Sequence, residues 1–254
     1  RCTIVRVYDQ TGNGNHADAQ TQDAEDESVR PQPGNNNMSA ANASQEALTV
    51  SGKKVYSLWM KQAQAYWKNG SKTGMPLGDS PQGVYMVTSG KHYGDGCCFN
   101  YGNGPLSRKV TACGTIDAVN FSSNKLWDYG AGSGPWVMAD FECGLKAGGK
   151  GIVPSMPYAF VTAIEKNDGK TDYVLRGADA TTGKLTTFLK TKLPYSQKKE
   201  GAVNLGAGGD CCYSNSTLSQ GTFYEGAIVA GYPSDAVEDQ VQANIVSAGY
   251  KELP

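Results

Sequence analysis

The chain reads WVMADFEC at residues 136–143, and this run predicts a β-strand. Side chains alternate between the two faces of a strand, so Asp140 and Glu142 share a face with Trp136 and Met138. Burying two acids beside large hydrophobic side chains costs free energy, and a functional role would account for that cost. This face therefore suits a groove that binds a sugar, and an ordinary solvent-facing strand surface is the alternative. The opposite face takes Val137, Ala139, Phe141 and Cys143.

Similar short runs alternate with turn sequences along the whole chain, which carries 32 glycines. Gly-containing turns at 167–169 and 182–183 are typical of hairpins. The pattern predicts an antiparallel all-β protein. We expect residues 1–254 to form a single domain. The expected strands are 2–8, 47–60, 83–88, 115–121, 136–143, 159–165, 172–176, 184–190, 201–206 and 222–231.

Two other segments complete the predicted architecture. Residues 236–248 have apolar side chains at helical spacing and follow a capping pair, Ser234-Asp235, so they predict a short C-terminal helix packed on the sheets. Residues 20–46 are polar and acidic, and we expect them to form a long surface loop.

Composition excludes several classes of partner. The net charge is −1 with 19% charged residues, so no basic field exists to hold a nucleic acid. No apolar run approaches the roughly 18 residues of a membrane span. The cysteine and histidine spacings do not resemble a zinc site. We expect no nucleic acid, membrane, metal or cofactor.

Seven cysteines, including the adjacent pairs Cys97-Cys98 and Cys211-Cys212, indicate an oxidising compartment. Adjacent cysteines usually bond to different partners, and the odd count leaves one cysteine unpaired within the chain. Asn-x-Ser/Thr sequons add weight to a secreted, extracellular glycoprotein, although chance sequons in an Asn- and Ser-rich chain are the alternative. The sequons begin at Asn37, Asn42, Asn69, Asn120 and Asn215.

A second acidic candidate lies in Gly208-Gly209-Asp210, where glycines let the backbone approach a ligand and raise Asp210 to the rim of a groove. A plain Gly-Gly-Asp turn is the alternative. Glycoside hydrolysis needs two carboxyl groups across the scissile bond, and Glu142 and Asp210 meet that need if folding brings them together. His16 and His92, the only histidines, lie outside any nucleophile-elbow or protease-like context, so we expect both to be loop residues.

Several collinear blocks are similar to those of fungal α-L-arabinofuranosidases of glycoside hydrolase family 54. The similarity spans nearly the whole chain, and the blocks are specific together although each is weak alone. They are YDQTGNGNH (8–16), HYGDGCCFNYGN (92–103), WDYGAGSGPWVMADFE (127–142), GAGGD (206–210), GTFYEG (221–226) and GYPSD (231–235).

This resemblance implies a two-sheet, concanavalin-like jelly-roll sandwich and a retaining hydrolase that releases α-L-arabinofuranosyl groups from arabinose-containing polysaccharides. Glu142 would be the nucleophile and Asp210 the general acid/base. A vicinal disulfide between Cys97 and Cys98 would touch the sugar ring. The remaining substrate-binding residues implied are Trp127, Asp140 and Gly209.

The chain departs from the family pattern at both ends and beside both acids. The family's catalytic domain begins upstream of Arg1 and carries a partner for Cys2, so we expect Cys2 to bond to a separate N-terminal piece. We expect this chain to lack the family's C-terminal arabinose-binding module. The residues that follow the two acids differ from those of the family: Cys143-Gly144 follows Glu142, and Cys211-Cys212 follows Asp210. Cys143 has three candidate partners, namely Cys113, Cys211 and Cys212.

Two other functions compete with the arabinofuranosidase. One is a non-catalytic carbohydrate-binding or structural extracellular glycoprotein module, because a fold does not fix a function. The other is a hydrolase of the same fold acting on another pentose or a hexose. Asp140, Glu142 and Asp210 favour the enzyme, whereas their altered neighbours favour the module.

Overall fold

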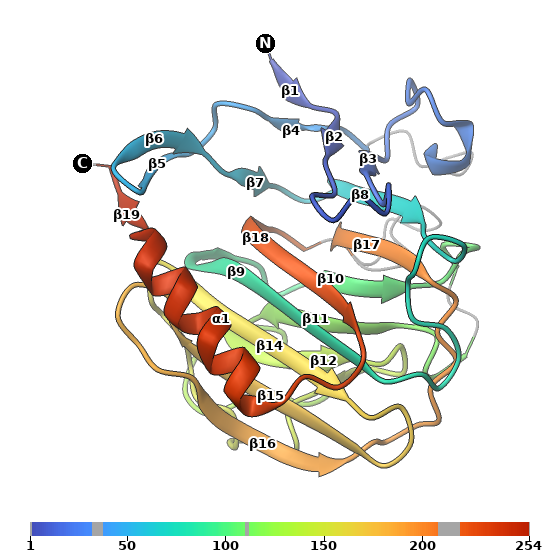
Figure 1. The fold of residues 1–254 in the computed structure, drawn as a ribbon, viewed down its shortest axis with the longest axis vertical. Helices are drawn as coiled ribbons and strands as arrows, with labels where there is room; N and C mark the ends of the chain where they lie inside the picture. The colour runs from blue at the N-terminus through green and yellow to red at the C-terminus, as the bar shows by residue number, and fades with distance from the viewer. Residues whose placement is uncertain (1, 32–37, 110–111, 208–218, 254) are drawn as a thin grey trace.

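The computed structural model describes residues 2–31, 38–109, 112–207 and 219–253. Two large antiparallel sheets stack as a β-sandwich (Figure 1), which confirms the predicted fold class. The first sheet has eight strands, in the order β13 (Leu145–Lys146), β12 (Trp136–Asp140), β11 (Asp117–Ser122), β10 (Phe99–Gly104), β17 (Ala202–Ala207), β8 (Ala65–Asn69), β3 (Ala17–Ala19) and β2 (Arg6–Val7).

The second large sheet has six strands, and smaller elements surround the sandwich. Its order is β16 (Thr186–Lys192), β15 (Asp172–Asp179), β14 (Val161–Asn167), β9 (Gln82–Tyr93), β18 (Gly221–Ala230) and β7 (Leu58–Met60). Both predicted hairpins, β14–β15 and β15–β16, are present. The smaller elements are β1 (Thr3–Ile4) with β4 (Ala41–Asn42), β19 (Lys251–Glu252) with β5 (Ala47–Val50) and β6 (Lys53–Tyr56), and the 3-10 turn Glu27–Val29.

Alternating side chains build the core between the two sheets. Val119 and Phe121 of β11 point into it, and so do Val137 and Ala139 of β12. The six-stranded sheet contributes Val84 and Met86 of β9 among others. Because neighbouring side chains alternate, the intervening residues of β11 and β12 lie on the outer face of the eight-stranded sheet.

Helix α1 (Asp235–Ala248) covers the outer face of the six-stranded sheet (Figure 1). Ser234 caps its first turn by accepting a hydrogen bond from the backbone of Val237, as predicted, and Gly249 ends the helix with φ +67°. Ile245 packs with Val87 in a second apolar cluster. None of the helices in the described part of the chain has the length and apolarity that a bilayer crossing requires.

Three local predictions were wrong, and one strand was missed. The strand expected at 136–143 ends at Asp140, because the chain bends sharply at Glu142. β9 runs on to Tyr93, so His92 lies in a strand and not in a loop. The missed strand is the interior strand β10 (residues 99–104, FNYGNG), which is not among the expected strands. Segment 20–46, expected to be a loop throughout, contains the 3-10 turn and β4.

A buried ionic cluster lies between the sheets. Asp117 of β11 and Glu165 of β14 are fully buried, and Lys199 Nζ lies 2.9 Å from Asp117 Oδ2. Asn167 Nδ2 donates to Asp117 Oδ1 at 2.8 Å and to Glu165 Oε1 at 3.0 Å. Burial and the nearby charge of Asp117 raise the pKa of Glu165 well above its usual value of 4.5. The neutral acid is therefore the favoured form of Glu165.

Glu165→Gln is expected to stabilise the fold at neutral pH, because glutamine supplies a neutral side chain with a donor and needs no proton. In the wild type, stability is full below the unfolded pKa of about 4.5 and declines as pH rises, because the folded state holds a proton that the unfolded state releases. Thermal melts should give a higher Tm for the variant at pH 8, by about 2–4 °C for each kcal/mol gained. The difference should shrink toward pH 4. Equal Tm values at pH 8 would contradict a neutral Glu165.

Candidate active site

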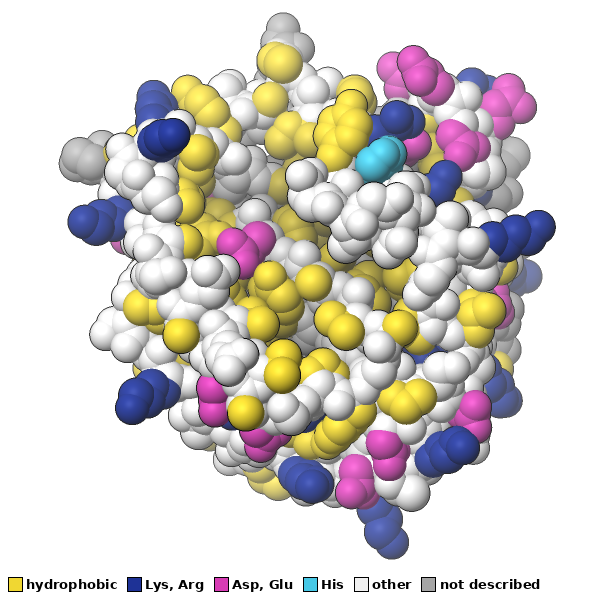
Figure 2. Space-filling model, in the orientation of Figure 1, with side chains coloured by type: hydrophobic (Ala, Val, Ile, Leu, Met, Phe, Trp, Pro, Cys, Tyr) yellow, Lys and Arg dark blue, Asp and Glu magenta, His cyan; other side chains and the backbone are white. Residues whose placement is uncertain are grey.

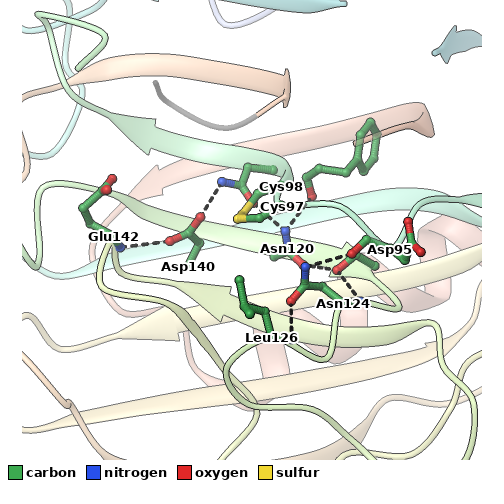
Figure 3. Close-up of a disulfide and its surroundings, with 11 residues drawn as sticks. Asp95, Cys97, Cys98, Asn120, Asn124, Leu126, Asp140 and Glu142 are labelled. Atoms are coloured by element: carbon green, nitrogen blue, oxygen red, sulfur yellow. Dashed lines mark hydrogen bonds between the residues drawn. A yellow bond between two sulfur atoms is a disulfide. The ribbon is translucent and has the colours of Figure 1, made fainter. Parts of the chain in front are cut away.

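Three adjacent strands bring polar side chains together on the outer face of the eight-stranded sheet. Asn100 of β10 pairs with Asn120 of β11, and Asn120 pairs with Met138 of β12. Asp140, two residues further along β12, shares the face of Met138 as the sequence predicts. The Cys97-Cys98 pair comes directly before β10 and lies beside these residues (Figure 3).

The disulfide between Cys97 and Cys98 that the resemblance implied is present in the structure. Cys98 is buried and Cys97 is half-buried, so part of the disulfide faces outward. Two hydrogen bonds tie the preceding loop to the loop after β11: Ser123 N donates to Gly94 O at 2.9 Å, and Asn124 Nδ2 donates to Asp95 O at 2.8 Å. The disulfide thus sits on a braced loop as an apolar surface.

Asp140 lies between the disulfide and Glu142 (Figure 3). It is 4% exposed, and its two oxygens accept separate hydrogen bonds: Oδ2 from Asn100 Nδ2 at 2.8 Å and Oδ1 from the backbone N–H of Glu142 at 2.9 Å. A buried carboxylate needs such donors. Its carboxylate and the two sulfurs lie within 4.8 Å of one another, but disulfide-bonded sulfurs are not the thiolates that bind metals.

Glu142 occupies the left-handed backbone region with φ +74°, which costs a non-glycine residue about 1–3 kcal/mol. Its neighbours hold this bend in place. Phe141 O accepts from Gly114 N at 2.7 Å, and Cys143 O accepts from the Tyr195 hydroxyl at 3.2 Å. The side chain of Glu142 is half-buried. The bend thus presents a carboxylate at the edge of the site.

A second disulfide fixes the same bend. It joins Cys143 to Cys113, one of the three partners that the sequence left open. Cys211 and Cys212 lie outside the described residues. Cys2 is exposed and has no disulfide partner in the described part of the chain, and its bond to a separate N-terminal piece stays a prediction.

Trp127 provides an aromatic surface next to this bend. It is 43% exposed and packs on Gly144, where an added Cβ would lie 2.7 Å from the indole ring. Gly144 also has φ +88°, so glycine is required here for both reasons. Asp128 Oδ2 fixes the Trp127 loop by accepting from the backbone N–H groups of Ala147 and Gly149 at 2.7 and 2.9 Å.

The predicted residues Gly209 and Asp210 lie outside the described residues. The strand that leads to them, β17, ends at Ala207, whose register partner is Phe99, the residue after the disulfide. The structure therefore brings Asp140, Glu142, Trp127 and the disulfide together. The described residues before Asp210 end at Ala207, on the strand next to β10.

Sequence reasoning missed the two asparagines beneath the site. The sequence marks Asn120 only as a sequon, yet it is fully buried and donates to Asn100 Oδ1 at 2.8 Å, so it cannot carry a glycan in the folded chain. Asn100 lies in a strand that was not predicted. The available signal was a polar amide at an outward position of the apolar strand 115–121. Of the other sequons, Asn69 is exposed and Asn42 is half-buried.

Both histidines have local structural roles. His92 stacks on Trp59 with ring centroids 3.9 Å apart, and its Nδ1 lies 2.9 Å from Thr222 Oγ1. Burial lowers the pKa of His92 to about 4, so the ring is neutral near pH 7. His16 Nδ1 accepts from the backbone N–H of Asp9 at 3.0 Å, within the predicted loop.

A separate apolar cavity of about 320 Å³ lies between α1 and the outer face of the six-stranded sheet, away from the face that carries the disulfide. Tyr232, Pro233 and Val237 are among its lining residues. Figure 2 shows hydrophobic side chains and hollows on the face seen in Figure 1, with acidic and basic side chains interspersed around them. Among the described residues, charged side chains of both signs are mixed on this face.

Comparisons with known proteins identify similar chains. Residues 1–251 match the family model described as "Alpha-L-arabinofuranosidase B, catalytic". The chain is 42% identical over 259 residues to Alpha-L-arabinofuranosidase B from Emericella nidulans, with 98% of this chain and 49% of the relative covered. The protein of the same name from Aspergillus niger is also 42% identical over 259 residues, with 98% and 50% covered. The chain thus spans about half the length of the curated relatives it matches.

Solved structures agree with these matches. A glycoside hydrolase family 54 α-L-arabinofuranosidase soaked with a cyclic sulfate inhibitor superposes with a TM-score of 0.88 at 38% identity, covering 99% of this chain and 52% of that chain. An arabinofuranosidase complexed with arabinofuranosyl-α-1,2-xylobiose gives 0.88 at 39% identity, with the same coverage.

Proposed function

The chain belongs to the family of alpha-L-arabinofuranosidase B catalytic domains, and from that membership we propose that it releases α-L-arabinofuranosyl groups from the non-reducing ends of arabinose-containing polysaccharides. The observation that carries the proposal is the braced bend at Glu142. It places a carboxylate beside a buried Asp140 and a vicinal disulfide. The relative solved with arabinofuranosyl-α-1,2-xylobiose supports arabinose-substituted xylan as one such substrate.

We propose a retaining mechanism with two steps. Asp210, protonated, gives its proton to the leaving glycosidic oxygen while Glu142 attacks the anomeric carbon, which breaks the glycosidic bond and forms a glycosyl ester. Asp210, now ionised, takes a proton from water, and that water attacks the anomeric carbon of the glycosyl ester, which breaks its bond to the Glu142 carboxylate and releases arabinose. The two carboxyl groups should lie roughly 5–5.5 Å apart.

The other side chains of the site have supporting roles in this proposal. The disulfide and Trp127 offer apolar and aromatic surfaces to the sugar ring. Asp140 and Gly209 offer polar contacts to its hydroxyl groups. These roles follow from the resemblance and from the positions of the described residues.

We further propose that the protein is secreted and acts outside the cell. Two disulfides among the described residues support an oxidising compartment. Of the sequon asparagines within the described residues, Asn69 is the exposed one and the best placed to carry a glycan.

A substrate comparison tests the proposed function. The wild-type protein should hydrolyse 4-nitrophenyl α-L-arabinofuranoside at least about 10²-fold more efficiently, in kcat/KM, than the β-D-xylopyranoside and the α-L-arabinopyranoside, because differential transition-state binding sets specificity. A folded but inactive protein would favour a carbohydrate-binding module. Higher activity on another glycoside would assign the site to another sugar.

A further inference from the structure

A continuous chain of hydrogen bonds runs beneath the site from β11 to the bend at Glu142. Ser122 Oγ donates to Asn120 Oδ1 at 2.9 Å, and Asn120 Nδ2 donates to Asn100 Oδ1 at 2.8 Å. Asn100 Nδ2 then donates to Asp140 Oδ2 at 2.8 Å, and Asp140 Oδ1 accepts from Glu142 N at 2.9 Å. We call Ser122, Asn120 and Asn100 the amide relay; all three are fully buried.

The direction of the relay follows from its surroundings. An asparagine amide can in principle be turned either way, but Asn120 Nδ2 also faces the backbone carbonyl of Phe99 at 3.3 Å, and only a donor is favourable there. The donor of Asn120 therefore points at Asn100, whose oxygen must accept it. As a result, the nitrogen of Asn100 must face the Asp140 carboxylate.

This direction matters because Glu142 has a strained backbone. Its φ of +74° persists only where the surroundings enforce it, and one enforcing contact is the hydrogen bond from its N–H to Asp140. The Asp140 carboxylate can accept this hydrogen bond only while its own position is fixed. Asn100 provides a fixed donor for that purpose from the neighbouring part of the sheet.

We propose that Asn100 is a positioning residue for the hydrolysis, which acts through Asp140 to hold the backbone turn that aims the Glu142 carboxylate. This inference rests on the proposed function of Glu142. It assigns a role to a residue that need not touch the sugar. It also accounts for three of the fully buried polar side chains in this sheet.

The test replaces the Asn100 donor with a group that donates only when protonated. In Asn100→Asp, a protonated carboxyl can still donate to Asp140, but an ionised one repels it, and two facing carboxyls at hydrogen-bond distance cannot both ionise readily. The ratio of variant to wild-type kcat on 4-nitrophenyl α-L-arabinofuranoside should therefore approach one at acidic pH and fall by about 10²-fold toward pH 8, as for a misplaced catalytic group. KM should change much less than kcat.

Asn103→Asp is the matched control. Asn103 lies on the same strand and is equally buried, but it donates to Pro76 O and to Gln82 of the other sheet. It should show no pH-dependent fall in the kcat ratio, whatever its loss of Tm.

Asn120→Asp provides a second variant, because the introduced carboxylate would turn the Asn100 amide and present its oxygen to Asp140. The same pH-dependent fall is expected.

The outcomes separate the two proposals. Two results for Asn100→Asp would overturn the positioning role of Asn100 and leave Glu142 as the nucleophile. One is a kcat ratio that does not depend on pH. The other is a kcat ratio that falls only together with a loss of Tm, when Asn103→Asp shows the same loss of Tm. An inactive wild type, or a fully active Glu142→Gln variant, would overturn the proposed function and the positioning role with it.

Discussion

Glu142→Gln is expected to lower kcat on 4-nitrophenyl α-L-arabinofuranoside by about 10³-fold or more, because the amide cannot form the glycosyl ester. The substitution keeps the size of the side chain and the backbone hydrogen bond to Asp140, so the bend and the binding surface should persist. KM should therefore change little, and kcat and kcat/KM should fall together, as expected when a transition-state interaction is lost. Initial rates over a substrate series measure both constants.

Glu165→Gln supplies the matched control for this substitution. It makes the same chemical change at a fully buried glutamate between the sheets, outside the candidate site. It should keep kcat near the wild-type value. If both variants retain full activity, Glu142 is not the nucleophile; if both lose it, the loss reflects the fold.

Asp210→Asn is expected to have an effect that depends on the leaving group. A general acid contributes about 10² to 10⁴-fold when the leaving oxygen needs a proton. An arabinosylated oligosaccharide needs that proton, whereas 4-nitrophenolate leaves without it. The loss in kcat/KM should therefore be much larger on the oligosaccharide than on the chromogenic substrate. The second step still lacks its base, so kcat on the chromogenic substrate should fall together with KM.

Two results would contradict the role of Asp210. One is an equal loss of kcat/KM on both substrates, which indicates damage to binding or folding. The other is no loss on the oligosaccharide, which would transfer the acid role to another residue. Measuring both substrates with one enzyme preparation separates these results from differences in protein quality.

The sandwich could be predicted from the sequence because its apolar strands alternate clearly and end in glycine-rich turns. The strand β12 shows this well, since Asp140 lies on the face that alternation assigns to it. β10 could not be predicted in the same way. Its asparagines and glycines resemble a turn, and they are stable in a central strand only because Asn100 and Asn103 find buried partners far along the chain.

The bend at Glu142 could not be predicted from the sequence either. Alternation extends the strand to Cys143, but the chain turns at Glu142 with positive φ. Contacts from distant residues, the Cys113–Cys143 disulfide and the Tyr195 hydroxyl among them, hold that turn. The family resemblance identified Glu142, Asp140 and the vicinal disulfide as candidates. Only the three-dimensional structure reveals the amide relay, which reaches Asp140 and, through it, the backbone of Glu142.

The most direct test of the proposed mechanism is to label the wild-type protein with an arabinofuranose-configured cyclic sulfate and to map the adduct by peptide mass spectrometry. A carboxylate that attacks the anomeric carbon opens the cyclic sulfate and keeps the sugar as an ester, which reports the nucleophile itself. We predict one adduct per chain, on the peptide that carries Glu142, and none in Glu142→Gln. An adduct on another carboxylate, or no adduct on an active enzyme, would contradict the assignment of Glu142 as the nucleophile of a retaining hydrolase.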